Sequence, residues 1–265
     1  MPSSDRQTAG ATSIGVLMSE ELRRVLRRRA TWIVGGLGVL VALVMVGIST
    51  FTSLDGHGVY RTTLNGLMRP LVIPFVALLL GGPLIVEEVE QRTLPYLLLR
   101  PIPRPQLFAG KLIPAAAVGA ALTGAMLGIV YLGCEVPSMG WGDTITDFGV
   151  TFGGVGLATV AYTAVFAALG ALFSSSLYAG ILYYGVVELV ISQLPIIKLV
   201  SVQYHLANMT GSQTASPGGS SLISALLSGA SIGLPWWVSM LFLAGLTVAM
   251  AGVGGLVLSE KQFEI

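Results

Sequence analysis

The sequence predicts an all-α integral membrane protein with six transmembrane helices, and three observations lead to this prediction. Only 10% of the 265 residues are charged, whereas a soluble globular domain carries about 25% charged residues. Hydrophobic residues make up 54% of the chain, and its mean hydropathy is +0.81. Apolar segments of the length that a membrane helix needs, about 20 residues, recur along the chain. A bilayer must therefore surround most of its surface.

Six apolar segments are expected to cross the membrane. They cover residues 31–51, 70–86, 112–134, 148–173, 179–197 and 234–258, and Pro74 and Pro83 interrupt the short second segment. Together they define a transmembrane domain over 31–258, with an N-terminal part, 1–30, a cytoplasmic segment, 87–111, a long extracytoplasmic loop, 199–233, and a C-terminal tail, 259–265. The first apolar run is too long for the core of a cleaved signal peptide, so we expect it to remain as an anchor.

The distribution of basic residues predicts the orientation, because Lys and Arg are enriched at the cytoplasmic ends of membrane helices. A cytoplasmic N-terminus places eleven of the 14 basic residues inside, which are Arg6, Arg23, Arg24, Arg27, Arg28, Arg29, Arg92, Arg100, Arg104, Lys111 and Lys261. It leaves only Arg61, Arg69 and Lys198 outside. Both termini are therefore expected in the cytoplasm.

The segment before the first span has the pattern of an amphipathic helix. Its apolar residues recur at helical spacing and are Ile14, Leu17, Met18, Leu22, Val25 and Leu26. Its charged residues take the other side and are Glu20, Glu21, Arg23, Arg24, Arg27 and Arg28. A helix with this division of side chains is typical of the membrane interface, so we expect it to lie along the cytoplasmic surface.

The cytoplasmic segment 87–111 combines three features that a simple loop does not need. Three carboxylates, Glu87, Glu88 and Glu90, are followed by the apolar residues Leu94, Leu97 and Leu98. Prolines at 101, 103 and 105 then restrict the backbone, because each proline fixes its own φ and limits the residue before it. Exposed leucines on a stiff segment indicate a surface that contacts a partner protein.

This segment resembles the cytoplasmic motif of type-2 ABC transporter permease subunits. The motif has the form E-x-E-x-x-T-L-x-x-L-L-x-x-P-[ILV]-x-R-x-x-[LI]-x-x-G-K. It is matched here by Glu88, Glu90, Thr93, Leu94, Leu97, Leu98, Pro101, Ile102, Arg104, Leu107, Gly110 and Lys111. The chain departs from the pattern at Arg92, where many relatives have Gly, and at Pro95. Its arrangement is most similar to the copper-pathway branch, which serves nitrous oxide reductase maturation.

The resemblance implies a non-catalytic subunit of an ATP-driven exporter in a bacterial or archaeal plasma membrane. It implies that a coupling segment docks on a separate ABC ATPase through Glu87, Glu88, Glu90, Thr93, Leu94, Leu97, Leu98, Pro101 and Arg104. It also implies two permeases with two ATPases, which we expect to form around a permease homodimer. The chain is expected to bind no cofactor itself, with ATP and Mg on the ATPase. The sequence agrees, because it contains no G-x-x-x-x-G-K-[ST] phosphate loop.

Glu188 is the only acidic residue deep in a predicted span. A carboxylate at the bilayer centre costs roughly 2.5–3.5 kcal/mol on insertion scales, so such residues usually face a cavity or a partner. Tyr184, Glu188 and Ser192 recur at i, i+4 and i+8 and so share one helix face. This face is expected to line the transport pathway or the dimer interface. The alternative is a protonated Glu188 that is hydrogen-bonded within the bundle.

Two other classes of protein fit parts of the sequence. A channel or secondary transporter is one, although the spans show no inverted repeat. An intramembrane serine hydrolase is the other, because residues 229–233 match G-x-S-x-G, but the context lacks the strand–turn–helix that this motif requires. His57, His205 and the single cysteine, Cys134, have no partners at ligand spacing, so no metal site is predicted. Close helix packing is suggested by Gly-x-x-x-Gly at 124–128 and at 149–153.

Overall fold

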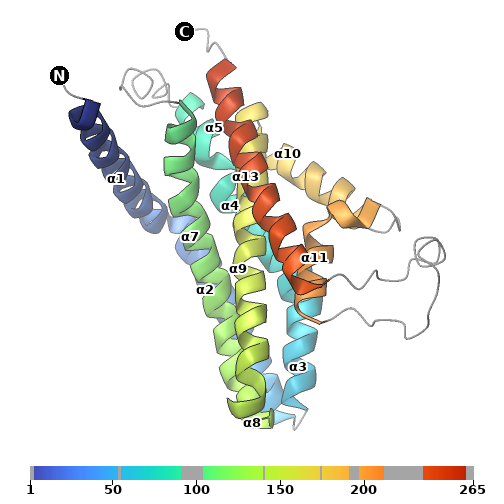
Figure 1. Ribbon diagram of the computed structural model, residues 1–265. Coiled ribbons are helices and arrows are strands. Elements are labelled where there is room, and N and C mark those ends of the chain that lie inside the picture. Colours follow the sequence, from blue (N-terminus) through green and yellow to red (C-terminus); the bar gives the residue numbers. More distant parts are fainter. Residues whose placement is uncertain are drawn as a thin grey trace.

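The computed structural model describes residues 3–52, 55–90, 104–139, 141–173, 175–190, 197–211 and 235–260. The regular elements within these ranges are all helices, which confirms the predicted all-α class. Figure 1 shows them as an elongated bundle with both termini at one end. We call this the terminal end, and we call the other end, where α3 and α8 lie, the distal end.

The bundle is built from long helices joined by short ones. In chain order the elements are α1 (Ser3–Arg27), α2 (Arg29–Phe51), α3 (Gly56–Thr63), η1 (Leu64–Val72), α4 (Ile73–Gly81), α5 (Pro83–Glu90), α7 (Arg104–Val130), η2 (Tyr131–Glu135), α8 (Val136–Met139), α9 (Trp141–Leu172), α10 (Ser176–Tyr183), η3 (Tyr184–Val190), η5 (Ile197–Val200), α11 (Val202–Met209) and α13 (Trp236–Glu260). The segments η1, η2 and η3 are π-helical and η5 is a 3₁₀ helix.

Five helices in the described part of the chain are long and apolar enough to cross a membrane. They cover Arg29–Phe51, Gly56–Val86, Pro105–Glu135, Asp147–Leu172 and Trp236–Leu258. The chain is therefore a membrane-embedded protein. The predicted fifth span, 179–197, corresponds to the shorter apolar helix Ser176–Leu189, and residues 191–196 lie outside the described ranges.

The second span differs most from the prediction, because its helix begins at Gly56 and not near residue 70. Arg61 and Arg69, which the charge count placed outside the membrane between the first two spans, are thus part of the helix. The physical reason is that a backbone inside a membrane must satisfy its own hydrogen bonds, so a helix continues through polar residues. The π-helical turn of η1 also accommodates Pro70, which the structure places inside this segment.

The long helix α9 forms the centre of the bundle and packs against α13, α7, α4, α10 and α11. Its inward side chains, such as Ala158, Ala161 and Tyr162, are fully buried. Two glycines allow α9 and its neighbours to approach closely: a Cβ on Gly81 would lie 2.5 Å from the Thr163 carbonyl oxygen, and one on Gly170 would lie 2.4 Å from the Gly82 carbonyl oxygen. The close packing predicted at 124–128 and 149–153 is found only at Gly124, which faces Phe152. A Cβ added at position 128, 149 or 153 would meet no atom within 4 Å.

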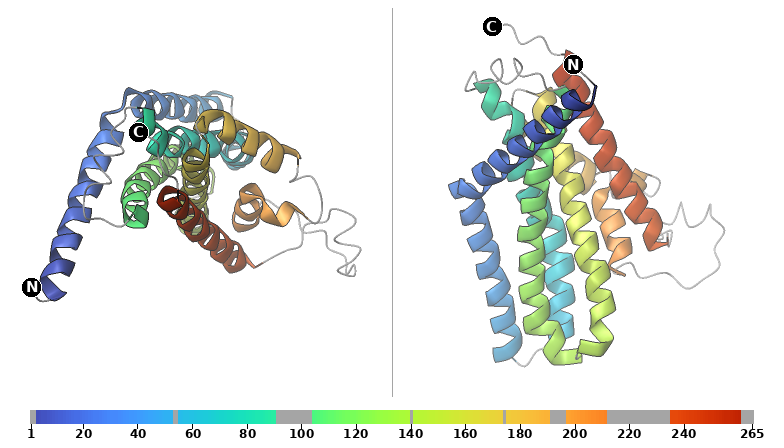
Figure 2. Two further views of the ribbon diagram at one scale, coloured as in Figure 1. Left: turned by 90° about the horizontal axis from the view of Figure 1, so that it is seen from above. Right: turned by 60° about the vertical axis from the view of Figure 1, so that its left-hand side comes forward.

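The helix α1 leaves the bundle at the terminal end and runs sideways from it, as the view from above shows (Figure 2). It contacts α7 and the first turns of α2. Leu17 and Val25 are buried against this contact, whereas Val16, Leu22 and Leu26 are exposed. The amphipathic segment thus forms a helix that buries only one of its apolar edges within the chain.

The predicted loop 199–233 contains a buried helix, α11, which packs against α13 and α9. Val202, Leu206 and Met209 are buried. The sequence did not indicate this helix, because an apolar stretch of eight residues is too short to be distinguished from a loop by its hydropathy. Burial against two long helices, rather than local propensity, stabilises a helix of this length.

Candidate functional site

The first group of predicted site residues runs from the end of α5 to the start of α7, and both of these helix ends lie at the terminal end (Figure 1). Glu87, Glu88 and Glu90 lie in the last turns of α5, and Arg104 begins α7. The other members, Thr93, Leu94, Leu97, Leu98 and Pro101, lie outside the described residues. The structure thus gives the two helices that flank the predicted coupling segment.

The end of the same motif packs against α1. Lys111, on α7, donates to the Glu21 carboxylate with Nζ 3.4 Å from Oε2, and the two side chains are only 2% and 8% exposed. Beside this pair, a Cβ on Gly110 would lie 2.6 Å from Leu17 Cδ2. The Gly-Lys end of the motif therefore fixes the N-terminal helix to α7, a role that the sequence did not reveal.

This ion pair is surrounded by apolar side chains. Leu107 and Phe108 are buried with Leu17 and Val25 in one cluster. A buried ion pair repays the cost of desolvation only when its geometry is well defined, and the loss of one partner leaves an uncompensated charge. The pair therefore fixes the position of α1 more than it adds stability, and it joins α1 to the start of α7.

The second group of predicted residues belongs to the predicted fifth span, which begins in the structure with the apolar helix Ser176–Leu189. Tyr184 and Glu188 belong to the π-helix η3, and Ser192 lies outside the described residues. Glu188 is only 2% exposed. Within the described chain both residues contact α11, and Tyr184 also contacts η1. Short π-helical segments inside longer helices are frequent at functional sites, and here η1 and η3 both contact the short helix α11.

Glu188 binds the N-terminus of α11. Its carboxylate accepts hydrogen bonds from the Ser201 hydroxyl and from the Val202 backbone N–H, the latter at 3.0 Å. The Ser201 hydroxyl in turn accepts from the Tyr204 N–H at 3.2 Å, as an N-cap residue does. A carboxylate beside the positive end of a helix is stabilised by the helix dipole. Glu188 thus acts as a second cap that joins η3 to α11.

Tyr184 connects three elements. Its hydroxyl donates to the carbonyl of Pro70, on η1, and accepts from Gln203 Nε2, on α11, at 2.9 Å. In an α-helix the Pro70 carbonyl would accept from residue 74, but Pro74 has no N–H. The Tyr184 hydroxyl therefore supplies the donor that the proline removes, as neighbouring helices commonly do for broken membrane helices.

Sequence analysis missed a cationic member of this region, Arg69. The half-buried Arg69 donates from Nη1 to Asn65 Oδ1 at 3.0 Å, and it interacts electrostatically with the fully buried Tyr162 of α9. Glu188 also interacts electrostatically with Tyr162. The i, i+4 spacing of Asn65 and Arg69 is a signal that could have placed both on one face of a helix.

His205 holds the other side of α11. Its Nε2 lies 2.8 Å from the Leu199 carbonyl oxygen and its Nδ1 lies 3.1 Å from the Ser239 hydroxyl, on α13. A carbonyl only accepts, so Nε2 carries the ring hydrogen and Nδ1 accepts. The ring also stacks on Phe242 at a centroid distance of 4.0 Å. Burial lowers the pKa of His205, and the bond to the Leu199 carbonyl raises it by less.

The described residues contain no group of three or more His, Cys, Asp or Glu side chains that could hold a metal ion. The segment 229–233, which matched the hydrolase motif, lies outside the described ranges. The polar groups of η1, η3, α9 and α11 instead bind one another across an apolar bundle. Such an arrangement positions the helices relative to each other, as polar residues that pair inside a membrane commonly do.

The comparison with protein families agrees with the motif and the helical bundle. A family model described as ABC-2 family transporter protein matches residues 17–194. No curated protein matches the chain. The matched range is more than half of the chain, and it includes the Glu21–Lys111 pair, the segment between α5 and α7, and Glu188. The chain therefore belongs to the ABC-2 family of transporter proteins, as a membrane component of transport.

Proposed function

We propose that the chain is the permease subunit of an ATP-driven exporter whose ATP and Mg are bound by a separate ATPase. The observation that carries this proposal is the family match, which spans the whole of the predicted coupling segment, 87–111. The subunit itself has no catalytic role in this proposal. The given sequence contains no phosphate loop, which supports hydrolysis by a separate polypeptide.

The proposed coupling segment lies between α5 and α7, and the latter is fixed to α1 by the buried Glu21–Lys111 pair. An ATPase that pushes on Glu87, Glu88, Glu90 and the residues up to Arg104 would therefore move α7 and α1 together. The helix α5 also packs against α9, the centre of the bundle. This connection supports a coupling role, because it joins the segment to the helices that would move.

The proposed orientation places the terminal end in the cytoplasm of a bacterial or archaeal plasma membrane. That end carries Arg23, Arg24, Arg27, Arg28 and Arg29 on α1 and at the start of α2. Basic residues at one end of a bundle support a cytoplasmic location. The copper-pathway branch of the family stays a prediction from resemblance.

The proposed assembly contains two copies of this chain and two copies of the ATPase. The outer helices support association within the membrane, since only 11% of the α2 window and 22% of the α13 window are buried, compared with 72% for α9. Either lipid or a second copy would cover these apolar faces. A homodimer is the simplest arrangement that gives each ATPase one coupling segment.

The test is a pull-down of an ABC ATPase with this chain, with ATP turnover measured in the reconstituted complex. Leu97→Ala combined with Glu90→Lys should weaken ATPase association about 10-fold or more, because loss of a central interface side chain removes on the order of 1–2 kcal/mol. The charge effect should diminish at high salt. The control is Leu132→Ala, an exposed leucine on η2 at the distal end. Normal binding and coupling by the double variant would show that this segment is not the coupling element.

A further inference from the structure

The distal end of the bundle contains a pocket that the proposed transport function does not use. Its volume is about 180 Å³, and its walls come from α3, η1, η2, α9 and the end of α11. This volume is below the roughly 300–1,000 Å³ of a pocket for a drug-sized ligand and suits a small molecule or a lipid headgroup. Under the proposed orientation, on which this inference rests, the pocket opens on the extracytoplasmic side.

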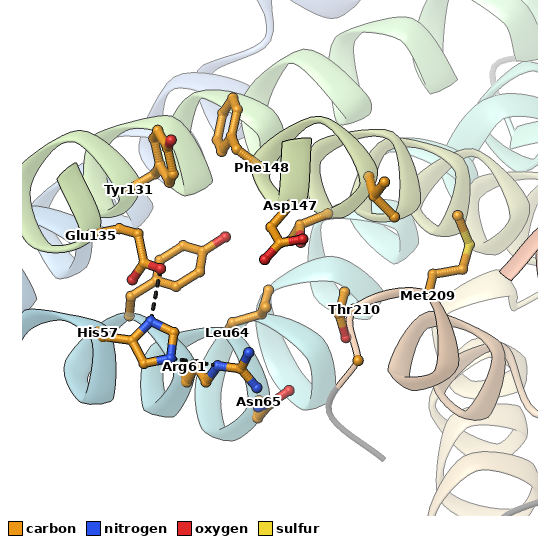
Figure 3. A pocket seen from close by; sticks show the side chains of 14 residues that line it. His57, Arg61, Leu64, Asn65, Tyr131, Glu135, Asp147, Phe148, Met209 and Thr210 are labelled. Atoms are coloured by element: carbon orange, nitrogen blue, oxygen red, sulfur yellow. Dashed lines mark hydrogen bonds and ion pairs between the residues drawn. The ribbon is translucent and has the colours of Figure 1, made fainter. Parts of the chain in front are cut away.

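One wall of the pocket holds an arginine in a fixed position. Arg61 donates from Nε to His57 Nε2 at 3.0 Å, and His57 Nδ1 lies 2.8 Å from Glu135 Oε1. A guanidinium only donates, so Nε2 of His57 must accept, and Nδ1 therefore carries the hydrogen that Glu135 receives. Figure 3 shows this chain of contacts and the Arg61 guanidinium beside Asn65.

The contact with His57 uses Nε and leaves the two terminal nitrogens of Arg61 in the fork geometry that a carboxylate or phosphate binds. Arg61 is an exposed residue, although the hydrogen bond from its Nε holds the base of the guanidinium. An arginine whose position is fixed loses less conformational entropy when a ligand binds. Arg61 is therefore preorganised for an anionic group.

The opposite wall presents a carboxylate. Asp147, on α9, points into the same space as the Arg61 guanidinium (Figure 3). These two side chains form no ion pair with each other in the part of the chain that the structure describes. With Glu135 the pocket holds two carboxylates and one guanidinium, so a purely anionic ligand meets net repulsion. An ammonium group near Asp147 would remove that repulsion.

We propose that this pocket binds a zwitterion in which a short linker joins a phosphate or carboxylate to an ammonium group. The anionic group would contact Arg61 and the ammonium group would contact Asp147. The side-chain amide of Asn65 and the hydroxyl of Thr151 line the same space and offer further hydrogen bonds. The same chemistry occurs in soluble zwitterions and in the headgroup of phosphatidylethanolamine, and the experiment separates these sources.

The experiment measures ligand binding to the purified full-length chain without the ATPase, so its failure does not bear on the coupling proposal. In the soluble arm, O-phosphoethanolamine should raise the melting temperature in a concentration-dependent way, because a ligand that binds only the folded state stabilises it. Inorganic phosphate and ethanolamine should each require at least 10-fold higher concentrations for the same shift. In the lipid arm, the protein is placed in nanodiscs of phosphatidylglycerol with added phosphatidylethanolamine. Native mass spectrometry should then show phosphatidylethanolamine that stays bound to the protein.

The variants test which residues recognise the two charges. Arg61→Gln and Asp147→Asn should each weaken binding at least 10-fold. The control is Asp55→Asn, which also removes one carboxylate at the distal end but does not line the pocket, and Asn retains the helix cap. Equal binding of phosphate alone by the wild type, an unchanged affinity in Asp147→Asn, or no binding in either arm would overturn the proposal. The tests of phosphate alone and of binding in either arm use the wild type, so they do not depend on whether a variant folds.

Discussion

The Lys111 ammonium lies 3.4 Å from the Glu21 carboxylate, and the two buried side chains join α7 to the N-terminal helix α1. Their positions are separated by 90 residues. The pair connects the last residue of the family motif to the helix that we expect at the membrane surface. Its removal should therefore affect both the stability of the terminal end and the transmission of force from an ATPase.

Lys111→Met should destabilise the protein by about 3 kcal/mol, because it removes the buried partner of Glu21 and leaves only the longer contact to Arg24, at 3.8 Å. The double variant Glu21→Leu with Lys111→Met should recover most of this stability while ATP-driven transport stays impaired. Thermal unfolding in detergent and transport in vesicles would measure the two effects. Arg24→Gln is the control, since the Arg24–Glu21 contact is longer, at 3.8 Å, and Arg24 is partly exposed. A double variant with normal transport would exclude the mechanical role of this pair.

Glu188→Ala should loosen α11, because the Ser201 hydroxyl and the Val202 N–H lose their shared acceptor. Each hydrogen bond contributes about 0.5–1.5 kcal/mol, so the loss of both should accelerate amide exchange over Val202–Met209 about 5-fold or more. Glu188→Gln, which keeps one acceptor oxygen, should have a smaller effect. Hydrogen exchange measured by mass spectrometry tests this, with the exposed Val186→Ala of η3 as the matched control. Unchanged exchange in Glu188→Ala would show that the carboxylate does not hold α11.

Gly170→Ala should disrupt the packing of α9, because the new Cβ would lie 2.4 Å from a backbone carbonyl oxygen that has no rotamer to change. Overpacking of this kind costs typically 1–3 kcal/mol, and a backbone contact lies at the upper end. Gly153→Ala on the same helix meets no atom within 4 Å and should be neutral or stabilising, since Gly is a poor helix former. Melting temperatures of the two variants decide the matter, and a Gly170→Ala protein as stable as the wild type would contradict the packing described here.

His205 should make the protein less stable as the pH falls below about 6.5, its ordinary pKa. Burial lowers the pKa of His205 in the folded chain, so the unfolded chain binds a proton that the folded chain does not. The stability is complete above pH 6.5 and decreases by up to about 1.4 kcal/mol per pH unit below it. Unfolding measured between pH 8 and pH 5 should show this slope in the wild type and a smaller one in His205→Gln. Parallel curves for the two proteins would contradict the assignment, since His57 is common to both.

Much of the architecture could be predicted from the sequence, because it follows from composition and spacing. A low charge content and repeated apolar segments determine a helical membrane protein, since only helices and closed barrels satisfy the backbone in lipid. The Glu88-to-Lys111 motif indicated the family that the comparison then showed. The segments 31–51 and 234–258 lie within two residues of the helices Arg29–Phe51 and Trp236–Glu260 at each end. These features depend on residues that are close together in the chain.

Only the tertiary structure decided which polar residues meet. Tyr184 donates to the Pro70 carbonyl across 114 positions, and Glu135 contacts His57 across 78. Hydropathy sums side chains without regard to their direction, so the predicted second span began after Arg69 although the helix continues through this residue. The spacing of Tyr184 and Glu188 indicated a shared face, but their partners on α11 lie in a segment that read as a loop. Contacts of this kind depend on how helices pack in three dimensions, and that packing is a property of the whole bundle.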